Sequence, residues 1–188
     1  MLLLKDQRKF QMNAEIKILL IGNPILSIVS YSFVILLIFN IFKVNYFNPI
    51  VSFFTKIYEQ ILRIPFLFSN QMVNIFLIAT FIKFISLVMV FGEQEEVLTL
   101  ILVAIIQILI ALIRLIFLSI IIGVILSWVS PPKLNIFLEL VEEISYKSLA
   151  PIRKYIPSAG GLDFSPLFVL IFTNVLAGFL VNLFIGIV

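Results

Sequence analysis

The feature that most limits the possible folds is a set of long stretches with almost no charge. Residues 25–42 and 164–188 contain no Asp, Glu, Lys or Arg. A helix rises about 1.5 Å per residue, so about 20 apolar residues cross the ~30 Å hydrocarbon core of a bilayer. We place membrane spans at 20–42, 66–91, 97–129 and 164–188. The sequence therefore predicts an all-α membrane protein with about four transmembrane helices.

Composition agrees with lipid as the solvent and excludes most enzyme chemistry. Hydrophobic residues make up 62% of the 188 residues and charged residues 12%, whereas globular domains are near half apolar and a quarter charged. The chain has no Cys and no His, which excludes a thiol nucleophile, an imidazole base and thiolate or imidazole metal ligands. We therefore expect no enzyme activity, no catalytic residues, no metal and no cofactor.

Two spans leave alternatives open. Pro24 suits the first turn of a helix, but the apolar residues before it allow an earlier start with Pro24 as a kink. The third span has 33 residues, about 50 Å of helix, so it must tilt, kink near Gly123 or extend beyond the bilayer. Residues 1–19 form a separate N-terminal segment, in which Met12 is an alternative start.

Two stretches between spans are amphipathic and too polar to cross a membrane. In residues 44–63, Asn48-Pro49 marks a helix start and apolar residues recur every three or four positions. Residues 135–149 repeat the pattern, with Glu and Lys opposite an apolar side. We interpret both as helices in the headgroup plane, which is compatible with docking a partner.

The order of span, amphipathic helix and span occurs twice. An offset of 87 aligns the halves and pairs Asn48 with Asn135 at the start of each amphipathic helix. We predict a first, degenerate repeat at 20–91 and a second at 97–188. Two spans per repeat make the halves parallel, related by an axis along the membrane normal.

Lys and Arg near the span ends predict the orientation. The loops at 43–65 and 130–163 lie on one face and carry seven Lys and Arg, whereas the loop at 92–96 carries none. We place both amphipathic helices in the cytoplasm and both termini outside. Lys5, Arg8 and Lys9 of the N-terminal segment argue the other way.

Three polar residues fall within the spans: Lys83, Gln107 and Arg114. We interpret Lys83 as snorkelling toward the membrane surface. Gln107 and Arg114 lie seven apart and nearly on one helical face. A membrane-buried Arg faces the bundle interior and pairs, but the nearest carboxylates in the sequence are all toward one end, so no partner is named.

The segment before the last span carries a dense motif. Arg153 and Lys154 lie between Pro151 and Pro157, which we expect to hold them in an extended or turn conformation at the membrane surface. There they would contact anionic lipid or a partner. Gly160 and Gly161 permit a tight turn, after which the last span begins.

Asp163 precedes this last span and can cap it by accepting backbone N–H bonds. Ser165 and Pro166 suit the first helical turn. An ion pair between Asp163 and Arg153, stapling the loop, is a hypothesis.

These residues carry a family resemblance. The order is Leu-Ser-Trp ending at Trp128, then the segment 149–157, then Gly-Gly-Leu-Asp-Phe-Ser-Pro from Gly160 to Pro166. It resembles the YggT family, also called YlmG, of bacteria and plastids. The first half fits loosely: Tyr46–Pro49 is similar to the family's helix start, but Phe76 stands where the second half has Asp163.

The resemblance implies a small bacterial inner-membrane protein, linked to osmotic-stress tolerance, cell division or cytochrome maturation. We expect a non-enzymatic scaffold or assembly factor whose cytoplasmic amphipathic helices dock partners or lipid. The alternative is a transport or channel component with Gln107 and Arg114 lining a polar path. Expected partners are the lipid bilayer, membrane proteins of division or assembly and other copies of the chain, but no nucleic acid.

Overall fold

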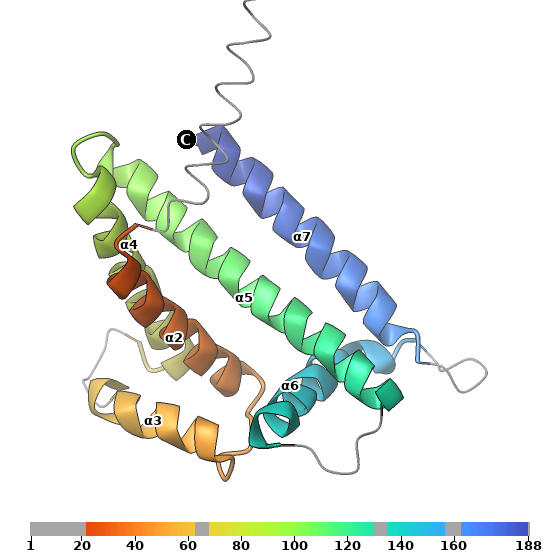
Figure 1. Ribbon diagram of the computed structural model, residues 1–188. Helices are drawn as coiled ribbons and strands as arrows, with labels where there is room; N and C mark the ends of the chain where they lie inside the picture. Colours follow the sequence, from red (N-terminus) through yellow and green to blue (C-terminus); the bar gives the residue numbers. More distant parts are fainter. Residues whose placement is uncertain (1–21, 63–67, 130–134, 157–162, 188) are drawn as a thin grey trace, which may run out of the picture.

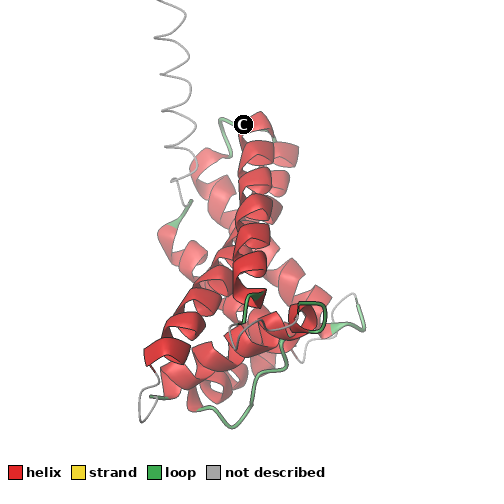
Figure 2. Ribbon diagram, turned by 90° about the vertical axis from the view of Figure 1, so that its right-hand side faces the viewer, coloured by secondary structure: helices red, strands yellow, loops and turns green. Residues whose placement is uncertain are grey.

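The computed structural model describes residues 22–62, 68–129, 135–156 and 163–187, and these residues are helical with connecting loops (Figures 1 and 2). Four helices are long and apolar enough to cross a membrane. The all-α membrane fold with four spans is therefore confirmed. The helices are α2 (Pro24–Ile41), α3 (Pro49–Leu62), α4 (Gln71–Phe91), α5 (Val97–Val129), α6 (Ile136–Arg153) and α7 (Ser165–Ile187).

Asparagine caps fix two helix starts that hydropathy placed too early. The Asn23 side chain accepts hydrogen bonds from Ile25 N and Leu26 N, so Pro24 is the first helical residue and not a kink. Asn70 accepts from Met72 N, and α4 begins at Gln71, five residues after the expected start of its span at 66. In both cases a side-chain oxygen satisfies an N–H that the first turn leaves without a partner.

The four spans form one bundle, and the two amphipathic helices lie across the same end of it (Figure 1). α2 packs against α4 and α5 packs against α7, while α4 and α5 join the pairs. The C-terminus lies at the opposite end from α3 and α6 (Figure 1). The structure thus repeats the order of span, amphipathic helix and span, and the repeat boundaries at 20–91 and 97–188 remain a prediction.

Buried apolar side chains hold the bundle together in three clusters. One joins α2 to α4 around Phe33 and Ile75, and another joins α4, α5 and α7 around Leu87 and Phe184. The third binds the end of α2 to both amphipathic helices, through Phe39, Val44, Val51, Leu140 and Ile144. Within a bilayer, such contacts stabilise helix association through van der Waals packing.

α6 uses its apolar side for packing within the protein. Leu140, Val141, Ile144 and Leu149, which belong to the predicted apolar side, are buried and face the bundle and not lipid. Gly123 lies where α5 meets α6, and a Cβ built on it would be 2.5 Å from Ser145 Cβ. The glycine of the 33-residue span therefore permits close approach of α6, and α5 continues as helix through it.

The prediction that Pro151 holds Arg153 in an extended or turn segment is wrong. Pro151 and Arg153 belong to the last turn of α6, and Lys154 is its C-cap. Proline removes one backbone donor and fixes φ near −65°, which a helix accommodates. Near a helix end the loss of one hydrogen bond is tolerated, and the buried side chains upstream keep α6 continuous.

Candidate functional site

A polar network joins α2 and α4 inside the bundle. Lys83 of α4 is fully buried, and its Nζ donates to Ser27 Oγ at 3.0 Å. Its ammonium also lies 5.1 Å from the ring centroid of Tyr31, a cation–π geometry. Ser27 and Ser86 share a hydrogen bond of 3.0 Å between their hydroxyls. The interpretation of Lys83 as a snorkelling residue is therefore wrong, because its side chain turns into the α2–α4 interface where these partners satisfy it.

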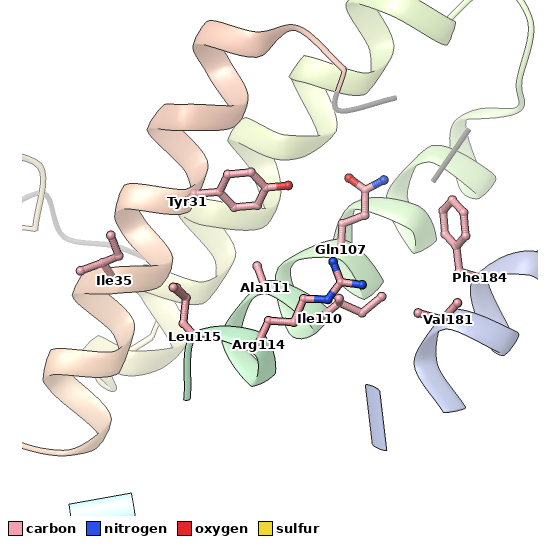
Figure 3. A pocket seen from close by; sticks show the side chains of 9 residues that line it. All are labelled: Tyr31, Ile35, Gln107, Ile110, Ala111, Arg114, Leu115, Val181 and Phe184. Carbon is pink, nitrogen blue, oxygen red and sulfur yellow. The ribbon is translucent and has the colours of Figure 1, made fainter. Parts of the chain in front are cut away.

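A groove of about 370 Å³ lies beside this network, between α2, α5 and α7. Gln107 and Arg114 extend from α5 into it, and the Tyr31 hydroxyl points toward the same space (Figure 3). The walls are otherwise apolar and come from three helices: Ile35 of α2, Ile110, Ala111 and Leu115 of α5, and Val181 and Phe184 of α7. The predicted common face of Gln107 and Arg114 is thus confirmed.

The charges of the described spans gather around Tyr31. Lys83 contacts the ring, and Arg114 lies in the groove that the hydroxyl faces. The described spans contain no Asp or Glu. The structure therefore holds two cations within the membrane region without an intramembrane carboxylate to balance them, which favours an anionic group.

Sequence reasoning missed Ser27 and Tyr31. The available signal was three polar side chains, Ser27, Ser30 and Tyr31, on neighbouring positions of one face of an apolar span. Such a face in a membrane helix indicates contact with another helix. Combined with Lys83 in the following span, it could have predicted the network.

The motif near the last span forms a corner between α6 and α7. Arg153 Nε donates to Asp163 Oδ2 at 2.8 Å, so the hypothesised ion pair forms. The Arg153 guanidinium also lies 5.0 Å from the centroid of the Tyr146 ring. Asp163 Oδ1 accepts from Ser165 N at 2.9 Å, which confirms its capping role. One carboxylate thus ties the end of α6 to the start of α7.

Electrostatics at this corner favour an ionised Asp163. Partial burial alone would raise the pKa of its carboxyl, but the hydrogen bonds from Arg153 and Ser165 and the charge of Arg153 outweigh that effect. The pKa of Asp163 therefore lies below its usual value. Both side chains remain about one-third exposed, so the pair is a surface ion pair of modest energy.

The remaining motif residues surround this corner or lie outside the described part of the chain. Trp128 is 81% exposed near the end of α5, a position where membrane proteins place interfacial tryptophans. Lys154 is exposed, and Pro166 lies in the first turn of α7. Pro157, Gly160 and Gly161 fall outside the described residues.

Hydrogen bonds join residues 43–48, which lead into α3, to α6 at the end of the bundle. Asn48 Nδ2 donates to Ile136 O at 3.0 Å, and Asn45 N donates to Glu143 Oε1 at 2.8 Å. Lys147 Nζ bonds both Glu143 and the Lys43 carbonyl at 2.7 Å. Asn48 and Asn135 each accept backbone N–H bonds in the first helical turn, as the alignment of the halves predicts.

This joined end, which we call the platform (α3, α6 and residues 43–48), keeps an exposed apolar patch. Its large apolar side chains are 47–92% exposed and come from both halves: Phe47, Phe53, Ile57, Ile136 and Phe137. An open groove of about 520 Å³ separates Phe53 of α3 from Phe137 of α6. The described residues contain no cluster of three or more acidic side chains that would hold a metal ion.

Comparison with known proteins finds similarity over parts of the chain. A protein of Pseudomonas aeruginosa, described as uncharacterised, is 50% identical over 52 residues, which span 28% of this chain and 26% of that protein. No solved structure matches the chain. The CCB3/YggT family matches residues 102–184, from within α5 to the last turns of α7. Residues 102–184 of this membrane protein are therefore similar to the CCB3/YggT family.

Proposed function

We propose that the chain is a non-enzymatic scaffold or assembly factor of the bacterial inner membrane. The observation that carries this proposal is the platform, in which residues 43–48, which lead into α3, are hydrogen-bonded to α6 of the other half. Its apolar patch lies beside charged residues such as Lys56 and Glu139. Exposed apolar patches rimmed by charge are typical of surfaces that bind protein or membrane.

The distribution of basic residues supports a cytoplasmic platform. Lys43, Lys56, Lys147 and Lys154 belong to the end that holds α3 and α6, whereas the α4–α5 turn at the other end carries only acidic charge. Such asymmetry sets the cytoplasmic side of membrane proteins. A scaffold in this orientation would present the platform to cytoplasmic proteins and to the inner leaflet. Through the family relation, osmotic-stress tolerance, cell division and cytochrome maturation are the processes to examine in a deletion strain.

Photocrosslinking in native membranes tests the proposal. A photoreactive amino acid replaces Phe53 on the platform, and a matched control replaces Gln94, which is exposed in the α4–α5 turn at the opposite end. We expect a defined set of protein adducts from position 53 that position 94 does not give. Adducts with lipid alone at position 53 would contradict a docking role for the platform.

The groove at Arg114 favours a second candidate, a transport or channel component. Arg114, Gln107 and Tyr31 give an otherwise apolar groove its polar face. Anion flux into vesicles containing the purified chain, abolished by Arg114→Leu, would support this function. Equal flux in vesicles with and without the protein would exclude it.

A further inference from the structure

Arg114 has no ionic partner in the part of the chain that the structure describes. It lies near the middle of the 33-residue α5, and its side chain is exposed toward the groove (Figure 3). It forms no hydrogen bond or ion pair with any described residue. An arginine at the centre of a membrane helix costs about 2.5–3.5 kcal/mol on insertion scales. Such a residue is retained when a counter-charge reaches it.

The described helices of the chain cannot supply this counter-charge. The four spans hold no Asp or Glu. The nearest carboxylate along α5 belongs to Glu96, 18 residues away, about 27 Å along a helix. At the other end Glu143 already pairs with Lys147. The described spans of a second copy would lack carboxylates in the same way.

Depth argues against a lipid headgroup as the source. α6 crosses α5 at Gly123, nine residues beyond Arg114. That separation is about 14 Å of helix, so Arg114 lies well inside the end marked by the platform. A phospholipid phosphate would have to descend most of this distance into hydrocarbon. A carboxylate carried on a membrane-spanning helix is already at that depth.

The groove has donors and walls that fit such a carboxylate. α5 forms its floor, and α2 and α7 form its sides. Beside the Arg114 guanidinium, the Gln107 amide and the Tyr31 hydroxyl are further donors that face the same space (Figure 3). Apolar side chains such as Ile35 and Val181 would pack against the neighbours of the carboxylate on the incoming helix. A volume of about 370 Å³ accommodates several side chains of that helix.

We infer that the groove between α2, α5 and α7 binds a transmembrane helix of another protein that carries an Asp or Glu, with Arg114 as its counter-charge. This inference deepens the proposed scaffold function, on which it rests, by naming the chemistry of a partner within the membrane. Arg–carboxylate pairs are charge-assisted and bidentate, which gives both affinity and orientation. A low dielectric strengthens the pair further.

The test uses the full chain in phosphatidylcholine vesicles and a labelled single-span Leu/Ala peptide with one central Glu. A matched peptide carries Gln at that position, and association is measured by resonance energy transfer. We expect the Glu peptide to associate about tenfold more tightly than the Gln peptide. This preference should vanish in Arg114→Gln and should persist in Lys56→Gln, which removes a charge from α3 outside the spans.

Charge reversal keeps the test informative if Arg114→Gln folds poorly. Arg114→Glu should reverse the preference, so that a peptide with a central Arg associates better than the Glu peptide. Equal association of the Glu and Gln peptides with the unaltered chain would overturn the inference. Loss of Glu-peptide binding when phosphatidylglycerol is added to the vesicles would also overturn it, because the groove would then bind a lipid headgroup. Neither result would alter the platform crosslinks at position 53, so failure of this inference is distinct from failure of the scaffold proposal.

Discussion

The contact between Gly123 and Ser145 sets how closely α5 approaches α6, and one methyl group tests it. A Cβ at position 123 would lie 2.2 Å from Ser145 Oγ and 2.5 Å from Ser145 Cβ. Carbon atoms in contact prefer about 3.5–4.0 Å, so Gly123→Ala must separate the helices by roughly 1 Å. Rotation of the hydroxyl relieves only the first clash, because Cβ is fixed to the α6 backbone.

Two opposing effects decide the magnitude for Gly123→Ala. Overpacking costs about 1–3 kcal/mol, and alanine gains about 0.8–1 kcal/mol over glycine in a helix interior. We expect a net loss of about 1 kcal/mol, within a range of about 0–2 kcal/mol, in the free energy of unfolding. The double variant Gly123→Ala with Ser145→Gly removes the clashing atoms and should recover much of that loss, giving a favourable coupling between the two positions.

Unfolding by sodium dodecyl sulfate in mixed micelles measures these free energies. Gly178→Ala is the matched control, because Gly178 lies inside the span α7 and nothing is within 4 Å of its built Cβ. That variant should be neutral or more stable by up to about 1 kcal/mol. If Gly123→Ala proves as stable as Gly178→Ala, α6 does not pack on α5 as described.

Three further results are expected. Arg153→Gln and Asp163→Asn should each destabilise the chain, with a coupling of about 0.2–1 kcal/mol in a double-mutant cycle; zero coupling would contradict the ion pair. The pKa of Asp163 in the folded state lies below its unfolded value of about 3.9. Its contribution to the free energy of unfolding is therefore present above about pH 4 and is lost as pH falls through the folded pKa. Measuring stability against pH should show this loss, and the Asp163→Asn variant should not show it. Ser27→Ala should lower the free energy of unfolding by about 1.5–3 kcal/mol, because it removes a hydrogen bond from the buried Lys83 ammonium. An amine reagent should also label Lys154 and leave Lys83 unlabelled. Equal labelling of the two lysines would contradict the burial of Lys83.

The sequence predicted the elements well where local signals decide them. α5 has the predicted bounds, since acidic residues precede it and prolines follow it. The Asn48 and Asn135 caps were visible as equivalent positions in the two halves. The starts of α2 and α4 were placed too early because hydropathy does not detect a helix cap. Asn23 and Asn70 are the N-caps, so each helix begins at the residue that follows.

What the sequence could not supply was the direction in which each side chain faces its neighbours. The position of Lys83 in its span is consistent with either snorkelling or burial. Only its hydrogen bond to Ser27 of α2 shows that the side chain is buried. The apolar side of α6 fits lipid or protein equally, and its contacts with α5 at Gly123 and with the end of α2 decide. Pro151 was expected to interrupt a helix, but buried contacts of the preceding turns outweigh its local preference. The Arg153–Asp163 pair was predictable because both residues flank one short connection.

Single-cysteine accessibility in intact and opened cells tests the central claim that both amphipathic helices lie at one end of a four-span bundle. The chain has no native Cys, so Lys56→Cys, Lys154→Cys and Gln94→Cys can each be labelled without background. We expect a membrane-impermeant maleimide to label position 94 in intact cells and positions 56 and 154 only after the cells are opened. Labelling of positions 56 and 154 from opposite sides of the membrane would contradict it.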